Sequence, residues 1–92
     1  MNESDFEKKL RADGYTEIAT QSLEPRPGKG HHGHDFAIRG LVLAGSFTVT
    51  QNGQSTTYRA GQIFEVADGH PHDESVGLEG ASVLTGRKYA KA

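Results

Sequence analysis

The sequence predicts an all-β fold, a sandwich or barrel of antiparallel strands preceded by a short N-terminal helix. After Gly14, segments rich in valine, isoleucine, threonine, tyrosine and phenylalanine alternate with turn residues at intervals of roughly 8 to 12 positions. A helical spacing of apolar residues occurs only before that glycine. The 92 residues suffice for one domain, and the apolar fraction of 34% together with 12 glycines is ordinary for a folded protein. We therefore expect a single domain over residues 1–92, with the barrel over about 16–89.

A short helix is expected over residues 4–12. Ser4 and Glu7 have the spacing of a capping box, in which each side chain accepts a hydrogen bond from a backbone N–H group at the start of a helix. Phe6 and Leu10 lie one turn apart and would form an apolar face. Gly14, after which the sequence pattern changes, favours the left-handed conformation that ends many helices. The helix is predicted to act as a lid or as an edge cover of the β-structure.

The Asn52-Gly53 pair predicts a tight β-hairpin. Both residues tolerate the positive φ angle that a two-residue type I′ turn requires, and strand-like residues flank the pair on both sides. Gly61 and Gly69 mark two further turns. Strands are expected over residues 16–22, 33–39, 40–51, 54–60, 62–67, 71–76 and 81–89.

Charge and composition exclude several classes of partner. Ten basic residues against 12 acidic ones give a formal net charge of -2, and no basic run is longer than two residues, so no nucleic acid or membrane partner is expected. The polar, acidic start of the chain does not resemble a secretion signal, which predicts a cytoplasmic location. Without cysteine, any metal must be held by nitrogen and oxygen. A chain this small without disulfides is expected to form a homodimer.

All five histidines lie in two short clusters, at residues 31–34 and 70–72. In a strand, residues two positions apart face the same side, so His32 and His34 can converge on one point. If an antiparallel strand brings His72 opposite them, three neutral imidazoles would suit a divalent transition metal such as Fe, Zn, Ni or Mn and would leave coordination positions open. The other two histidines are expected in a loop and a turn. The alternative is a solvent-exposed histidine pair and an ordinary turn, with no metal.

The two histidine clusters and their flanking glycines resemble the two sequence motifs of the cupins. The first cupin motif contains H-x-H, then a glutamate and a glycine, and here His32, His34 and Gly45 match it. The second contains a glycine, a histidine and an asparagine, and here Gly69 and His72 match it. The matched region covers about half of the chain. The resemblance implies a small jelly-roll barrel in which these three histidines bind the metal.

Two positions depart from the cupin motifs. Ile38 or Arg39 stands where the motifs place the glutamate ligand, and strand alternation selects Ile38; Val76 stands where they place the asparagine. Glu74 is the expected substitute carboxylate, because it lies two residues after the last ligand histidine and so faces the same side. The alternatives are an ion pair of Glu74 with Arg39 or Arg87 at the mouth of the barrel, and a three-histidine site completed by water.

Small and apolar residues near the histidines predict a ligand cavity. Gly40 is expected to leave room beside the ion. We therefore predict a metal-binding domain with an open coordination position for a small-molecule organic ligand. As an enzyme it would be a metal-dependent oxygenase, lyase or isomerase; the alternative is a non-catalytic binding or accessory dimeric module without a functional metal. The apolar walls of the cavity are expected to come from Ile38, Val42, Phe64 and Phe36.

Overall fold

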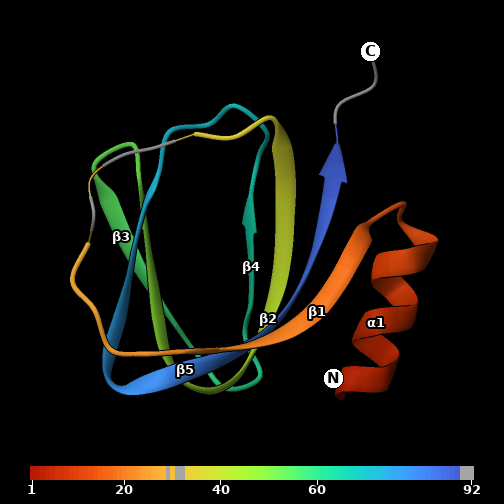
Figure 1. The fold of residues 1–92 in the computed structure, drawn as a ribbon, viewed down its shortest axis with the longest axis horizontal. Helices are drawn as coiled ribbons and strands as arrows, with labels where there is room; N and C mark the ends of the chain where they lie inside the picture. The colour runs from red at the N-terminus through yellow and green to blue at the C-terminus, as the bar shows by residue number, and fades with distance from the viewer. Residues whose placement is uncertain (29, 31–32, 90–92) are drawn as a thin grey trace.

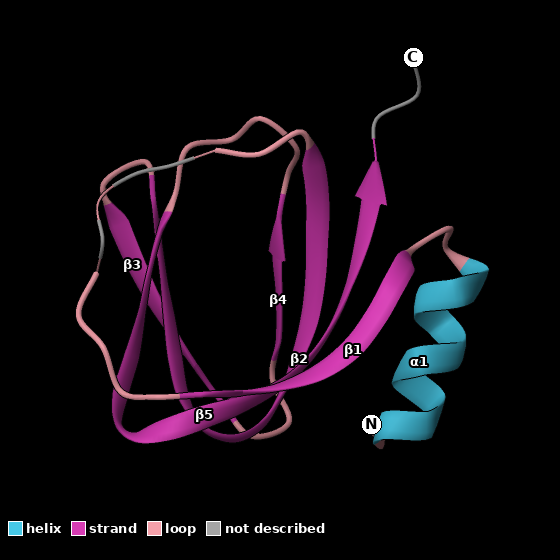
Figure 2. Cartoon of the chain, viewed as in Figure 1, coloured by secondary structure: helices cyan, strands magenta, loops and turns pink. Residues whose placement is uncertain are grey.

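The computed structural model describes residues 1–28, 30 and 33–89, which form a β-barrel with one helix at its side (Figure 1, Figure 2). The predicted all-β fold with a short N-terminal helix is confirmed. His31 and His32 lie outside the described residues. In chain order the elements are α1 (Glu3–Ala12), β1 (Thr16–Leu23), β2 (Phe36–Gln51), β3 (Gln54–Arg59), β4 (Ile63–Val66) and β5 (Asp73–Tyr89).

In the described part of the chain, five strands replace the seven that the sequence pattern predicts. The expected strands 33–39 and 40–51 are one strand, β2, and the expected strands 71–76 and 81–89 are one strand, β5. The expected boundaries fall at glycine-containing positions, at Gly40 in β2 and at residues 77–80 in β5, and these do not interrupt the strands. Long strands tolerate glycine where a bend or a close contact needs the missing side chain.

The two long strands β2 and β5 organise the barrel. They pair antiparallel over nearly their whole length, from Phe36 opposite Tyr89 to Thr50 opposite Asp73. At one end of this pair, β1 adds to β5 and β4 adds to β2. At the other end, β3 adds to β2. Because both long strands bend midway, the sheet curls round into a barrel (Figure 1).

The bend lies where Gly45 of β2 meets Gly80 of β5. Their φ angles are +75° and +73°, a region that favours glycine, and the pairing register shifts on both sides of Gly45. A Cβ atom at Gly45 would lie 2.0 Å from the carbonyl oxygen of Gly80. Only glycine therefore lets the two backbones approach this closely at the corner.

Alternating residues of the paired strands build two hydrophobic clusters, one on each face of the sheet. Val42 and Val83 are cross-strand partners in the inner cluster, whereas their neighbours Leu41 and Leu84 are partners in the outer one. This alternation is what strand geometry requires. The inner cluster fills the barrel and consists of Val42, Phe47, Val49, Phe64, Val66, Val76, Ala81 and Val83.

Helix α1 covers the outer cluster. Its apolar residues Phe6 and Leu10 are almost fully buried and pack with Leu41 and Leu84 of the sheet. Burying each such side chain stabilises the fold by about 1.5–3 kcal/mol. The predicted role of the helix as a cover is therefore confirmed, and the face it covers lies outside the barrel (Figure 2).

The helix begins one residue earlier than the sequence predicts. Its N-cap is Asn2, whose side-chain oxygen accepts a hydrogen bond of 2.8 Å from the backbone N–H group of Asp5. The predicted capping box at Ser4 was therefore wrong, because asparagine is an equally favourable N-cap and lies two residues upstream. Gly14, with a φ of +88°, ends the helix as expected.

The predicted hairpin between β2 and β3 is confirmed. Asn52 and Gly53 have φ angles of +53° and +76°, as a type I′ turn requires.

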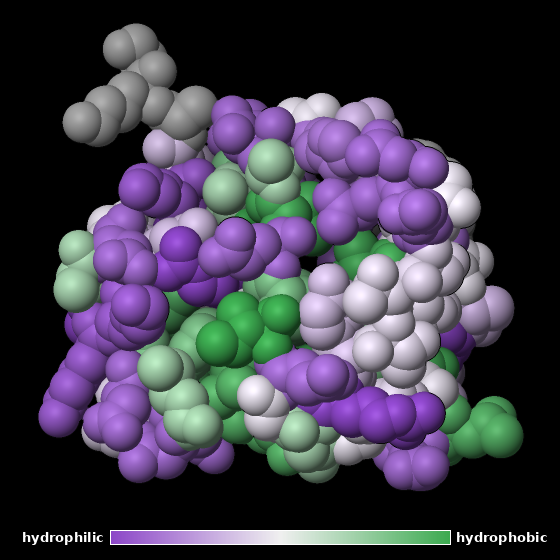
Figure 3. Space-filling model, turned by 180° about the vertical axis from the view of Figure 1, so that it is seen from behind, coloured by the Kyte–Doolittle hydropathy of each residue, from purple (hydrophilic) through white to green (hydrophobic). Residues whose placement is uncertain are grey.

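Hydrophilic side chains cover most of the back of the molecule, and hydrophobic ones show near the middle of that face (Figure 3). Over the residues that the structure describes, no helix has the length and apolar character that crossing a bilayer demands.

Arg39 of β2 joins the end of the helix to the sheet. Its guanidinium group lies 2.5 Å from the carboxylate of Asp13 and 2.6 Å from that of Glu65, and 4.6 Å from the ring centroid of Tyr15. The hydrogen bond from Arg39 holds the pKa of Asp13 below its ordinary value. The ion pair is therefore sensitive to acid.

Asp13→Asn is expected to lower the free energy of unfolding at pH 7 and to lose this effect in acid. A carboxyl group whose pKa is lowered by folding stabilises the folded state above its unfolded value of about 3.9. That contribution disappears as the pH falls through the lower folded value. Urea unfolding between pH 7 and pH 3 measures the gap in the free energy of unfolding between the unchanged protein and Asp13→Asn. The control is Asp68→Asn, which changes an exposed aspartate in a turn. A gap that stays constant over this range would contradict the assignment.

Candidate functional site

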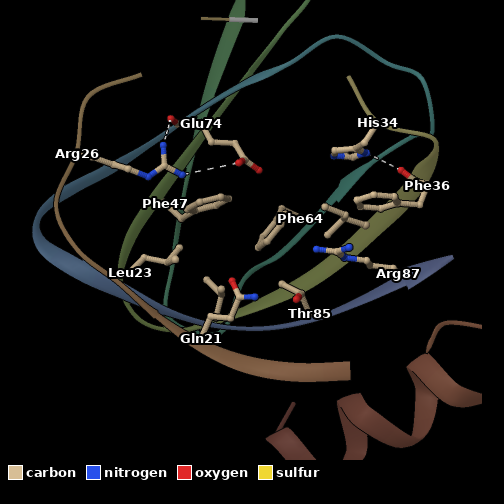
Figure 4. A pocket seen from close by; sticks show the side chains of 12 residues that line it. Gln21, Leu23, Arg26, His34, Phe36, Phe47, Phe64, Glu74, Thr85 and Arg87 are labelled. Carbon is tan, nitrogen blue, oxygen red and sulfur yellow. Dashed lines mark hydrogen bonds and ion pairs between the residues drawn. The ribbon is translucent and has the colours of Figure 1, made fainter. Parts of the chain in front are cut away.

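A pocket of about 240 Å³ opens inside the barrel (Figure 4). Its floor is apolar and belongs to the inner hydrophobic cluster, whereas its rim carries charged and polar side chains. Arg26 and Glu74 lie on one side, and His34 and Arg87 lie on the other (Figure 4). The lining residues are Gln21, Leu23, Arg26, His34, Phe36, Ile38, Phe47, Phe64, Glu74, Val83, Thr85 and Arg87.

His34 lines the pocket from the segment just before β2. Its ring stacks on that of Phe36, with centroids 4.1 Å apart and planes inclined by 4°. Its Nδ1 atom lies 2.8 Å from the carbonyl oxygen of Phe36. His34 was expected within a strand over 33–39, but β2 begins only at Phe36. Strand alternation therefore does not fix where the ring of His34 points; the contacts with Phe36 do.

His72 is completely buried and lies directly before β5. Its Nδ1 atom lies 3.1 Å from the carbonyl oxygen of His70. A carbonyl oxygen only accepts hydrogen bonds, so Nδ1 of His72 must carry the proton. For the same reason Nδ1 of His34, which bonds to the carbonyl oxygen of Phe36, must carry a proton. In the neutral rings, Nε2 then carries the lone pair of each histidine, which is the atom that a metal would need.

In the structure, His72 contacts both His34 and Glu74. The ring centroids of the two histidines lie 4.9 Å apart, and Nε2 of His72 lies 3.6 Å from a carboxylate oxygen of Glu74. The expectation that Glu74 shares a face with His72 is therefore confirmed. His32, the third expected ligand, lies outside the described residues. Within the described part of the chain, no group of three or more histidine, cysteine, aspartate or glutamate side chains has the arrangement of a metal site.

Glu74 also forms an ion pair, but with a different arginine from those expected. Arg26 lies 3.8 Å from the Glu74 carboxylate and donates a hydrogen bond of 2.9 Å to the Glu74 carbonyl oxygen. A pair of backbone hydrogen bonds between Arg26 and Val76 brings the loop before β2 alongside β5. The predicted partners of Glu74 were wrong: Arg39 pairs on the outer face, and Arg87 pairs with a residue of β1.

The cavity walls differ in part from those expected. Ile38, Phe36 and Phe64 line the pocket as predicted, whereas Val42 is buried in the inner cluster and does not. Gly40 leaves no empty space, because the ring of Phe64 lies over it and a Cβ atom there would be 2.3 Å from that ring. Gly40 and Phe64 are cross-strand partners, so the aromatic ring fills the place of the missing side chain.

Four polar residues line the pocket without having been predicted to do so. Thr85 and Arg87 could have been found, because with Val83 they form an alternating series on β5 that faces one side. Gln21 follows the same rule on β1. Arg26 could not, since it lies outside the strands and reaches the pocket only through its pairing with β5.

The fold matches solved structures closely, although no family model and no curated protein sequence matches the chain. A conserved protein of unknown function from Streptococcus pyogenes has a TM-score of 0.69 and 21% identity over 82% of this chain and 65% of its own. A cupin protein from Bacteroides fragilis has a TM-score of 0.64 and 18% identity over 82% and 66%. A predicted oxalate decarboxylase from Thermotoga maritima has a TM-score of 0.64 and 18% identity over 90% and 74%.

These likenesses identify the fold. The chain spans slightly less than two thirds of the length of the first two proteins, at 65% and 66%. Several of the matched structures are described as cupins, and the strands of this chain curl into a barrel around a pocket that the motif residue His34 lines. The chain is therefore a small domain with the cupin fold.

Proposed function

We propose that this domain binds a divalent transition metal at the histidine end of the pocket and accepts a small organic ligand beside the ion. His34 and His72 would each provide a ring nitrogen, and Glu74 a carboxylate oxygen. His32 is assigned as the third imidazole from the sequence motif alone. The observation that supports the proposal is that buried His72 contacts both His34, which comes from the segment before β2, and Glu74, which follows His72 by two residues.

The donor atoms fit such a metal. Imidazole nitrogen combined with carboxylate oxygen suits Fe, Zn, Ni or Mn better than Ca or Mg, which prefer oxygen alone. The hydrogen bonds from Nδ1 of His34 and His72 to backbone carbonyl groups are of the kind that orient histidine ligands in metal proteins. When bound, the ion would act as a Lewis acid toward a ligand oxygen or a water molecule.

The pocket supports a small organic ligand. Its volume of about 240 Å³ and its apolar floor of Phe47, Phe64 and Ile38 would hold a single ring or a short chain. One structure of the same fold is described as a predicted oxalate decarboxylase, an enzyme class that acts on a small organic acid. The fold alone selects no reaction, so the proposal stops at metal and ligand binding.

Elemental analysis after reconstitution tests the metal site. Untagged protein incubated with Fe, Zn, Ni or Mn and then desalted is expected to retain near-stoichiometric metal. His32→Ala, His34→Ala and His72→Ala should each abolish retention, whereas Glu74→Gln should weaken affinity by about tenfold or more. His70→Ala is the matched control, because it keeps the backbone carbonyl group that orients His72.

Two results would overturn the proposal. One is the absence of retained metal under every reconstitution condition, and the other is equal retention by the alanine variants and the unchanged protein. Either result would favour the non-catalytic binding module, in which His34, the buried His72 and Glu74 form a polar network that stabilises the barrel.

A further inference from the structure

The charges around the pocket are unbalanced. Among its described lining residues, two are arginines and one is a glutamate. Glu74 is paired with Arg26, which leaves Arg87 as the positive charge without a counterion in the lining. The ion-pair partner of Arg87 is Glu17, at 3.8 Å, with about half of its side chain exposed (52%). An exposed pair of this kind contributes little free energy, so a ligand carboxylate can replace it at small cost.

Arg87 is held in an orientation that suits ligand binding. Its guanidinium carbon lies 4.3 Å from the ring centroid of Phe36, and that ring stacks on His34. Figure 4 shows His34, Phe36 and Arg87 one above another, with the guanidinium group reaching toward the middle of the pocket. Stacking keeps the planar group fixed while its N–H donors stay available at the edge.

Two further hydrogen-bonding side chains lie on the same side of the pocket as Arg87. Thr85 precedes Arg87 by two residues on β5 and faces the same way, and Gln21 projects from the adjacent strand β1 (Figure 4). The apolar floor lies between this polar group and Glu74. The pocket thus combines a cationic anchor, neutral hydrogen-bonding groups and an apolar surface.

We propose that the ligand of this pocket is a small organic carboxylate and that Arg87 binds its carboxylate group. The apolar body of the ligand lies over Phe47 and Phe64, and its far end faces Glu74. The proposal rests on the proposed function, because it assigns the ligand class of the same pocket. The contact with Arg87 does not require a bound metal, so the two can be tested separately.

Titration of the metal-free protein in the presence of a chelator tests this proposal. The probes are benzoate and hexanoate, a ring and a chain, each compared with its uncharged amide by calorimetry. We expect at least one acid to bind at least about tenfold more tightly than its amide, since hydrogen bonds to a charged group contribute that much. Arg87→Gln should remove this preference. Lys88→Gln is the matched control. Lys88 is the next residue along β5 and lies outside the pocket lining, and its replacement removes one positive charge, as Arg87→Gln does.

A second variant keeps the test decisive if Arg87→Gln fails to fold. Glu17→Gln removes the competing carboxylate and is expected to tighten binding of the acid several-fold. Equal affinity for acids and amides in the unchanged protein, or an acid preference that survives in Arg87→Gln, would overturn the proposal. An Arg87-dependent acid preference in a protein that retains no metal would support this inference and refute the metal site.

Discussion

Gly45→Ala is expected to lower the free energy of unfolding by about 4 kcal/mol, which places it among the most damaging single substitutions. The added methyl group would lie 2.0 Å from the carbonyl oxygen of Gly80. This oxygen belongs to the backbone at the corner of the two long strands, so it cannot rotate away as a side chain could. Relief would require β2 and β5 to separate where they bend. The positive φ of +75° adds a further cost for any residue with a side chain.

The control for Gly45→Ala is Gly53→Ala. Gly53 has nearly the same φ angle, +76°, but an added Cβ atom there would meet nothing within 4 Å. Its cost should be only that of the backbone conformation, about 1–2 kcal/mol. Urea unfolding followed by circular dichroism measures both variants. Equal losses of stability in the two variants would show that the close contact with Gly80 does not matter.

Ile38→Glu is expected to raise metal affinity by at least about tenfold, because it supplies an anionic ligand where the cupin motif has one. Ile38 already lines the pocket and is opposite Arg87 in the strand pairing, so the new carboxylate would enter the site without moving the backbone. The proximity of Arg87 offsets part of its desolvation cost. Competition against a metal-binding dye measures the affinity.

Ile38→Gln separates charge from size in this experiment. It has the same length as glutamate and brings an amide oxygen but no charge, so its affinity should change far less. A rise of equal size in both variants would mean that the charge at this position is not responsible. An unchanged affinity in Ile38→Glu would place the ion, if bound, away from Ile38.

Local patterns predicted those features that depend on neighbours in the sequence. The hairpin at Asn52-Gly53 follows from two residues that tolerate positive φ, and the shared face of His72 and Glu74 follows from a spacing of two in a strand. The continuity of β2 through Gly40 could not be predicted, because the ring of Phe64 that fills its place comes from another strand.

Long-range contacts account for the errors at the candidate site. Arg26 pairs with Glu74 because a loop joins β5 at Val76, a contact between residues fifty positions apart that no local pattern encodes. The error at His34 has a local cause instead: the residue lies before β2, and its ring is held by stacking on Phe36 and not by strand geometry. The homodimer and the cytoplasmic location stay predictions.

Every other strand of the barrel pairs with β2 or β5, and this topology affects how fast the chain folds. Apart from the β2–β3 hairpin, the pairings that close the barrel join distant parts of the chain, as Phe36 with Tyr89 illustrates. Closing such large loops costs conformational entropy before any contact repays it, so folding is expected to take milliseconds to seconds, as in other proteins of non-local topology. Until β5 finds its register, both long strands carry unsatisfied edges, and this is the stage at which aggregation competes with folding.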